Sequence, residues 1–246
     1  MITGYQANPD LLRNRIILVT GAGDGIGRTA SLTYARHGAT VILLGRTVAK
    51  LESLYDEIIG ARFPEPGIVP MDLATDSAKE LQALEEVISD KYGRLDGLLH
   101  NAAILGERVP FETCDLDQWS RVMQVNFNSV FKLTRLLLPL LKLSANASII
   151  FTSSGVGAKP RAYWGAYSVS KYAMEGLAKL LADELENTSN IHVNILNPGA
   201  TRTSMRAAAV PGEDPQTVKT PEDLMDLYLY LMGPDSAAEN GKTFNA

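Results

Sequence analysis

Short apolar runs alternate with longer helical stretches along almost the whole chain. The first run, residues 16–20, is apolar and β-branched and ends in glycines, which is typical of a strand buried on both faces. Further strands are expected at residues 40–44, 67–71, 95–99, 148–152, 192–196 and 242–245. Helices are expected at about 25–37, 47–60, 76–91, 115–143, 165–187 and 221–232. The alternation predicts an α/β fold, a doubly wound parallel sheet of about seven strands with about three helices on each face.

Nothing in the sequence divides this pattern into separate parts. The chain has 246 residues and shows no internal repeat, low-complexity linker or change of composition. We therefore expect a single domain over residues 1–246, which is an ordinary length for one α/β unit. The least regular segment is about 204–220, which is rich in Ala, Pro and Gly. A long loop inside a compact domain is more often functional than idle, so we expect this loop to border a site.

The composition argues against several other classes of protein. The formal net charge of -5 disfavours nucleic acid as a partner. A single cysteine, Cys114, allows no intramolecular disulfide, and with three scattered histidines it predicts no metal site. The N-terminus lacks the basic start and apolar run of a secretory signal, and the apolar stretch 136–141 is too short to span a membrane. We expect a cytoplasmic protein with no membrane partner.

A glycine-rich turn follows the first expected strand and precedes the first expected helix. Glycine adopts backbone angles closed to other residues and lets a ligand approach closely, and the free N–H groups of a helix N-terminus suit a pyrophosphate. The strand–turn–helix context favours dinucleotide binding over a merely structural turn. The candidate cofactor-binding residues in this turn are Gly21, Gly23, Asp24, Gly25, Ile26 and Gly27.

Arg46 follows the second expected strand, at the place where an acidic residue would bind the ribose hydroxyls of NAD. An arginine can instead pair with a 2′-phosphate through two hydrogen bonds and stack on adenine. The sequence therefore predicts NADP(H) in preference to NAD(H), which stays open as the second cofactor. A solvated surface arginine is the alternative interpretation, and the negative charge of Asp24 in the phosphate turn weighs against NADP(H).

Tyr167 and Lys171 lie four residues apart on an expected helix, and Ser154 lies thirteen residues before the tyrosine. Residues i and i+4 share a helix face, so the lysine ammonium is expected beside the phenol. A phenol titrates at about pH 10 in water, and a neighbouring cation lowers that pKa. The three residues thus predict an acid/base group usable near neutral pH. Ser153 is the alternative to Ser154, and an ordinary amphipathic helix is the alternative for the Tyr–Lys pair.

Taken in order, these motifs resemble the short-chain dehydrogenase/reductase family in its form of about 250 residues. The likeness runs from about Arg15 to Phe244, and residues 15–21 and 197–203 also resemble the YciK-like subgroup of bacterial members. His100 and Ala103 depart from the family's asparagine and glycine. The matching residues are the turn 20–27, Asp72, Asn101, Ala102, Asn126, Ser154, Tyr167, Lys171, Pro198, Gly199 and Thr203.

The resemblance implies a Rossmann-fold oxidoreductase that interconverts a carbonyl and an alcohol by NADP(H)-dependent hydride transfer. It implies that Tyr167 is the acid/base group, that Ser154 holds the reacting oxygen, and that Lys171 lowers the tyrosine pKa and binds the nicotinamide ribose. Asn126 would anchor a water near the lysine. The remaining cofactor-binding residues that it implies are Asp72, Leu73, Asn101, Ala102, Pro198, Gly199, Thr201 and Thr203.

Each implied role has a structural alternative. The less favoured alternatives are a turn at a strand end for Asp72 and an ordinary loop for Thr203. For His100, a buried histidine with its hydrogen bonds satisfied is favoured over a catalytic one. For the whole protein the alternative is a catalytically silent NADP(H)-binding sensor or scaffold, which the intact serine, tyrosine and lysine disfavour. A serine hydrolase is disfavoured because the Gly-x-Ser-x-Gly turn is absent.

The substrate pocket and the assembly are the least constrained features. Residues 155–164 and 204–218 are expected to form the pocket wall, and Arg161 and Arg206 in them could meet an acid group. The aromatic residues of the first segment favour an apolar or ring-bearing small molecule. The expected helices 115–143 and 165–187 resemble the family's dimer-forming pair, so the resemblance implies a homodimer or homotetramer.

Overall fold

The computed structural model describes residues 4–75 and 77–246. Within these residues, seven strands form one sheet in the order β3-β2-β1-β4-β5-β6-β7, and every neighbouring pair is parallel. The strands are β1 Ile16–Thr20, β2 Thr40–Gly45, β3 Gly67–Pro70, β4 Gly97–His100, β5 Ala147–Thr152, β6 Ile191–Asn197 and β7 Thr243–Asn245. The predicted doubly wound parallel sheet is confirmed, with each strand within two residues of its expected bounds.

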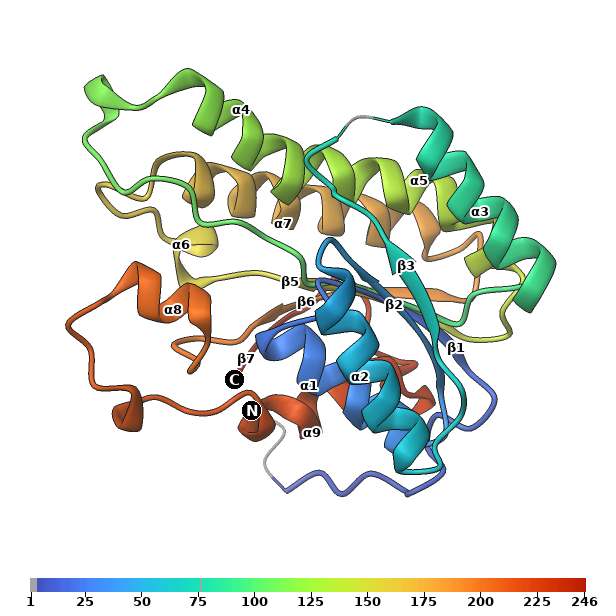
Figure 1. Ribbon diagram of the computed structural model, residues 1–246. Coiled ribbons are helices and arrows are strands. Elements are labelled where there is room, and N and C mark those ends of the chain that lie inside the picture. Colours follow the sequence, from blue (N-terminus) through green and yellow to red (C-terminus); the bar gives the residue numbers. More distant parts are fainter. Residues whose placement is uncertain (1–3, 76) are drawn as a thin grey trace.

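Helices cover both faces of this sheet (Figure 1). The helices α3, α4, α5 and α7 lie on one face, and α1, α2 and α9 lie on the other. With α4 and α5 taken as one interrupted helix, this agrees with the expected three on each face in the described chain. The helices are α1 Gly25–Arg36, α2 Val48–Gly60, α3 Ala78–Tyr92, α4 Leu116–Met123, α5 Ser129–Lys142, α6 Gly155–Ala158, α7 Gly165–Leu185, α8 Ser204–Ala209 and α9 Met225–Met232.

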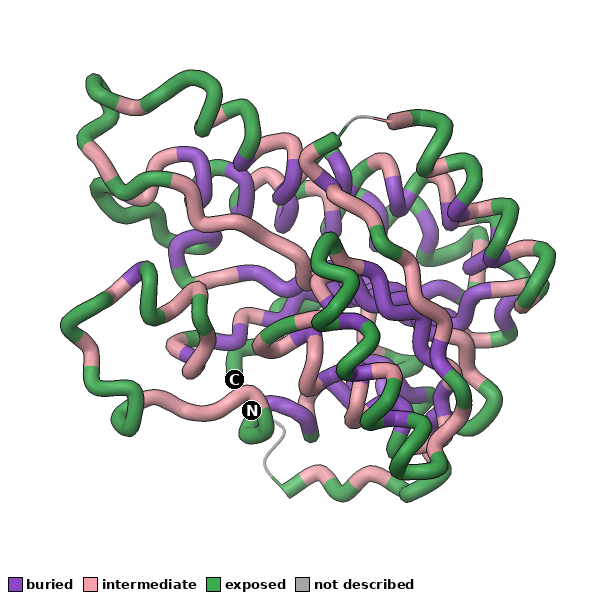
Figure 2. Tube along the Cα trace, in the orientation of Figure 1, coloured by how far each residue is buried: buried purple, intermediate pink, exposed green. Residues whose placement is uncertain are grey.

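The two helix layers explain why the strands are apolar at every position. Successive side chains of a strand point to opposite faces, and here both faces are covered. Leu98 and Ile149 pack into the core under α3, α5 and α7, whereas Leu99 and Ile150 pack into the core over α1, α2 and α9. The central strands are accordingly buried along their length (Figure 2).

The expected helix over 115–143 is interrupted. A π-helix, Gln124–Asn128, separates α4 from α5. A π turn adds a residue without breaking the helix, so apolar periodicity does not reveal it, and such turns are frequent at functional sites. A second difference lies in the loop expected at 204–220, where α8 forms behind Thr203. The Thr203 side chain caps this helix by accepting a hydrogen bond from Arg206 N at 3.1 Å.

The strand order places a crevice at the carboxyl ends of the central strands. The chain winds outward from β1 through β2 and β3, then returns to place β4 on the other side of β1. The segments that leave β1 and β4 therefore diverge at their carboxyl ends, and ligands of open α/β sheets bind at such a switch point. The glycine turn after β1 and Asn101 after β4 meet at these carboxyl ends.

Candidate active site

A cavity of about 380 Å³ opens at the carboxyl ends of the strands. It extends from Arg46 and Asp72 beside α2 to Trp164 and Met205 beside α8. Of the predicted site residues, Gly27 and Asn126 do not line it. The predicted residues that do are Gly21, Gly23, Asp24, Gly25, Ile26, Arg46, Asp72, Leu73, Asn101, Ala102, Ser154, Tyr167, Lys171, Pro198, Gly199, Thr201 and Thr203.

The glycine turn is held tightly against the segment after β4. Gly21 has a φ of 68°, and a Cβ there would lie 3.0 Å from the Ala102 Cα and 3.2 Å from the Asn101 Nδ2. Asn101 Nδ2 donates to the Thr20 carbonyl oxygen at 3.3 Å. A side chain on Gly27 would overlap the Gly21 carbonyl oxygen, so this glycine serves the close packing of α1 on the turn rather than the cavity wall.

Asp24, in the same turn, has a cationic partner that the sequence did not reveal. Lys50, in the first turn of α2, places its Nζ 2.5 Å from the Asp24 carboxylate, and both residues line the cavity. This hydrogen bond lowers the pKa of Asp24. Ser204 of α8 donates to the same carboxylate at 3.5 Å. The negative charge that weighed against NADP(H) is therefore balanced by a lysine that lies four residues from Arg46.

Tyr167 and Ser154 meet at the other end of the cavity. Tyr167 is 8% exposed on α7, and the Ser154 side chain hydrogen-bonds its hydroxyl. The ring of Trp164 packs on the tyrosine ring with their centroids 5.8 Å apart. Burial raises the pKa of Tyr167, and the hydrogen bond from Ser154 lowers it by less. The phenol therefore stays protonated at neutral pH.

Lys171 lies one helical turn beyond Tyr167, as predicted, with its Nζ 5.8 Å from the centroid of the tyrosine ring. Its ammonium donates to the Thr152 carbonyl oxygen at 2.7 Å. Burial lowers the pKa of Lys171 to about 8, against the opposing charge of Glu175. Burial dominates the pKa of Tyr167 in this structure and the ammonium donates to Thr152, so the expected lowering of the phenol pKa by Lys171 stays a prediction.

One cavity thus joins a glycine turn at a helix N-terminus to a Ser–Tyr–Lys cluster. The family model described as short chain dehydrogenase matches residues 15–214. The chain belongs to the short-chain dehydrogenase family. It is 52% identical over 242 residues to the uncharacterized oxidoreductase YciK of Escherichia coli strain K12, covering 98% of this chain and 95% of that protein. The predicted family and its YciK-like subgroup are confirmed.

Solved structures of this family agree with the fold along the whole chain. A short-chain dehydrogenase from Pseudomonas syringae has a TM-score of 0.97 at 53% identity, covering 100% of this chain and 99% of that one. Another from Shigella flexneri 2a strain 301, complexed with NADP, has a TM-score of 0.94 at 51% identity, covering 97% and 99%. The chain therefore shares its fold with these relatives over nearly its whole length.

In this short-chain dehydrogenase, Asn126 lies inside the π-helix and is 1% exposed. Its Oδ1 accepts from Ile104 N at 2.8 Å, and its Nδ2 donates to the Ile104 carbonyl oxygen and to Ser170 Oγ. These hydrogen bonds fix the segment after β4 against α7. Ile104 itself lines the cavity, so Asn126 supports the cavity wall without reaching the cavity. The expected contact of Asn126 with a water molecule stays a prediction.

His100 departs from the family's asparagine and is only half satisfied. Thr134 Oγ1 donates to the Val130 carbonyl oxygen, so it accepts from His100 Nε2, 2.8 Å away. His100 Nδ1 has no hydrogen-bond partner among the described residues. Burial and the Lys171 charge lower the pKa of His100 to about 3, so the ring is neutral. The interpretation as a fully satisfied buried histidine is corrected in this respect.

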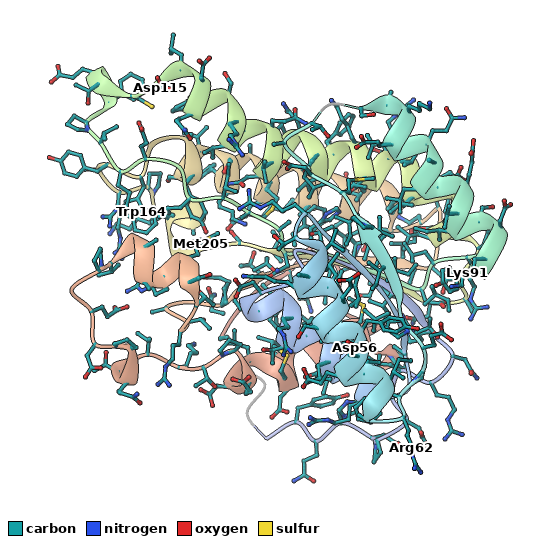
Figure 3. All side chains as sticks on the ribbon, viewed as in Figure 1. Asp56, Arg62, Lys91, Asp115, Trp164 and Met205 are labelled. Atoms are coloured by element: carbon teal, nitrogen blue, oxygen red, sulfur yellow. The ribbon has the colours of Figure 1, made fainter. Side chains whose placement is uncertain are left out.

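The far wall of the cavity differs in part from the expectation. Trp164 and Met205, both labelled in Figure 3, line it, whereas Arg161 and Tyr163 are exposed and do not line it. The Arg206 guanidinium pairs with the Glu213 carboxylate at 2.5 Å, which satisfies its charge within the loop.

Arg108 does not line the cavity but contacts two residues that do, Trp164 and Ala209, and the sequence analysis did not identify it. Its guanidinium carbon lies 4.6 Å from the centroid of the Trp164 ring, and its Nη1 donates to the Ala209 carbonyl oxygen. It therefore joins the segment after β4, the segment before α7 and the end of α8. No sequence motif marks such a contact, because it spans 101 residues.

Asp72 keeps both of its interpretations. Its Oδ1 accepts from Ala74 N at 2.9 Å, which is the turn expected at a strand end, and the residue also lines the cavity.

Among residues 4–75 and 77–246, no cluster of three or more His, Cys, Asp or Glu side chains is arranged to hold a metal ion. None of the described helices combines the length and the apolar character that crossing a membrane requires.

Proposed function

We propose that this protein is an NADP(H)-dependent oxidoreductase that interconverts a carbonyl and an alcohol by hydride transfer. The observation that carries the proposal is the hydrogen-bonded Ser154–Tyr167 pair in the same cavity as the glycine turn and Arg46. A proton donor and a dinucleotide cradle are needed together for this chemistry. The glycine turn, Arg46 and Ser154 follow β1, β2 and β5, and Tyr167 lies on α7.

The cradle fits a dinucleotide phosphate. Gly21 and Gly23 of the turn line the cavity, and the N-terminus of α1 offers free N–H groups to a pyrophosphate. Arg46 is exposed at the cavity and has no hydrogen bond or ion pair among the described residues, so its guanidinium is free to bind a 2′-phosphate. Lys50 stands one turn away. The similar Shigella protein, complexed with NADP, supports this assignment.

The other cavity residues extend the cradle from the adenine to the nicotinamide. Asp72 and Leu73 would border the adenine, Thr201 and Thr203 the carboxamide, and Lys171 the nicotinamide ribose. The bound nicotinamide supplies or accepts the hydride. These roles are the ones that the family resemblance implies, and each of these residues lines the cavity.

The protein residues handle the proton and the position of the oxygen. In the reductive direction Tyr167, which burial keeps protonated, donates its phenolic proton to the developing alkoxide. Ser154 hydrogen-bonds the same oxygen and holds it beside the tyrosine. The Lys171 ammonium, fixed by the Thr152 carbonyl, places positive charge near the phenolate that results. Apolar side chains of Trp164 and Met205 face the substrate space, which favours an apolar or ring-bearing carbonyl compound.

A panel of aldehydes and ketones tests this function through the loss of NADPH absorbance. We expect at least one apolar carbonyl compound to oxidise NADPH, and the Tyr167→Phe variant to serve as the blank. If NADPH bound but no compound in a broad panel were reduced, the protein would instead be a silent NADP(H)-binding sensor or scaffold.

Replacement of Arg46 by alanine should weaken NADPH binding about tenfold or more and leave NADH binding within about twofold, because only NADPH carries the 2′-phosphate that a guanidinium binds. Dissociation constants from nicotinamide fluorescence measure both. Arg161→Ala is the matched control, since Arg161 is exposed and does not line the cavity. An equal loss for the two nucleotides, or a wild-type preference for NADH, would remove Arg46 from cofactor selection.

We further propose that the chain forms a homodimer or homotetramer, which stays a prediction. Apolar side chains remain exposed on the two helices that the resemblance implicates. Phe131 of α5 is 47% exposed, and Tyr172 and Leu180 of α7 are 56% and 62% exposed. Contact between copies of the chain would cover them.

A further inference from the structure

Glu175 extends the row of functional side chains on α7. Tyr167, Lys171 and Glu175 follow one another at intervals of four residues and so share a helix face. The first two line the cavity, whereas Glu175 lies behind them and is 9% exposed. A carboxylate at this depth is costly unless it is hydrogen-bonded and its charge is compensated.

The carboxylate is held in place by its surroundings. Ser153 Oγ donates to Glu175 Oε1, and Ser153 is itself 2% exposed. Gly157 closes the same space: a Cβ there would lie 2.8 Å from Ser153 Oγ, 3.0 Å from Lys171 Cβ and 3.1 Å from Glu175 Oε1. The absence of a side chain at residue 157 therefore allows the serine, the lysine and the glutamate to pack together.

The charge of Glu175 acts on Lys171. Burial alone would favour the neutral amine, and the negative charge of Glu175 opposes this by raising the pKa of Lys171. The other titratable groups that face the lysine are Tyr167 on its own helix and His100 at the end of β4, and both are uncharged near pH 7. Among the described residues, Glu175 is thus the carboxylate that balances the buried ammonium.

We propose that Glu175 is a positioning residue of this site, whose carboxylate keeps Lys171 in its ammonium form and fixes Ser153, the neighbour of Ser154. The catalytic consequence of this arrangement depends on the proposed function, because the ammonium is the form that donates to the Thr152 carbonyl and to a ribose hydroxyl. A neutral amine donates less strongly and would leave the tyrosine without a neighbouring positive charge. The protonation state of Lys171 can also be measured in the protein without cofactor or substrate.

Two substitutions separate the charge of Glu175 from its hydrogen bond. Glu175→Gln removes the charge and keeps an oxygen that accepts from Ser153, whereas Ser153→Ala removes the hydrogen bond and keeps the charge. The pKa of Lys171 can be followed from its ¹³Cε chemical shift, assigned by its loss in Lys171→Arg. We expect the midpoint of Lys171 to fall by about one pH unit in Glu175→Gln and to stay in place in Ser153→Ala.

The enzyme assay gives a second readout. The alkaline limb of kcat/KM for NADPH reports the free enzyme, and it should move with the Lys171 midpoint. An unchanged midpoint in Glu175→Gln, or an equal shift in Ser153→Ala, would overturn the proposal. If Glu175→Gln did not fold, Glu175→Asp provides a second test, because it keeps the charge. This variant should fold and retain the wild-type midpoint of Lys171. A lowered midpoint in Glu175→Asp would count against the proposal. The NMR titration needs no cofactor or substrate, so a failure of the proposed function would show separately, as absent NADPH turnover with the midpoints as expected.

Discussion

Replacing Tyr167 with phenylalanine should lower turnover by about a hundredfold or more while NADPH still binds, because the change removes only the proton that the proposed reaction needs. The hydroxyl is the part of Tyr167 that Ser154 contacts, and the ring packs on Trp164. Phenylalanine keeps that packing, so the fold and the cavity should be retained. Steady-state turnover and NADPH affinity, measured on the same preparation, separate the two effects.

Tyr172→Phe is the matched control for this prediction. Tyr172 lies on the same helix, but it is 56% exposed and does not line the cavity, so turnover should not change. Turnover near the wild-type level in Tyr167→Phe would remove the tyrosine from the mechanism. A loss of NADPH binding equal to the loss of turnover would instead show that Tyr167 serves the cofactor alone.

Much of the fold follows from the sequence because each strand is buried on both faces. A run such as residues 16–20 must be apolar throughout to satisfy two cores at once, and this makes it visible without any structure. The π-helix at Gln124–Asn128 was not predictable in this way. It leaves the apolar face of the helix nearly unchanged, and the Asn126 hydrogen bonds to Ile104 and Ser170 that lie within it are made with distant segments.

The candidate site likewise contains some residues that local spacing predicts and others that it does not. Tyr167 and Lys171 were found because a four-residue interval fixes their common face, which is local information. Lys50 beside Asp24, 26 residues away, and Arg108 beside Ala209 depend on how distant segments pack, and no spacing rule signals them. The effect of burial on the pKa of Tyr167 was not foreseeable from spacing for a related reason, since burial is a property of the whole fold.

His100 gives the structure a sensitivity to acid. The ring is 2% exposed, and burial together with the Lys171 charge lowers its pKa to about 3, whereas an unfolded histidine titrates at about 6.5. Between these values the unfolded chain binds a proton that the folded protein does not. The contribution to stability is therefore complete above about pH 6.5 and is lost progressively as the pH falls toward about 3.

His100→Asn should remove this loss. Between pH 7 and pH 5 the free energy of unfolding of the wild type should fall by about 2 kcal/mol more than that of the variant, because about 1.5 pH units of this window are crossed at 1.36 kcal/mol each. Urea unfolding at the two pH values measures the difference. His192→Asn is the control: His192 is only partly buried, so most of the acid sensitivity should persist in that variant. The same pH dependence in wild type and His100→Asn would mean that His100 takes up a proton without disturbing the fold, and that its unpartnered Nδ1 finds an acceptor when charged.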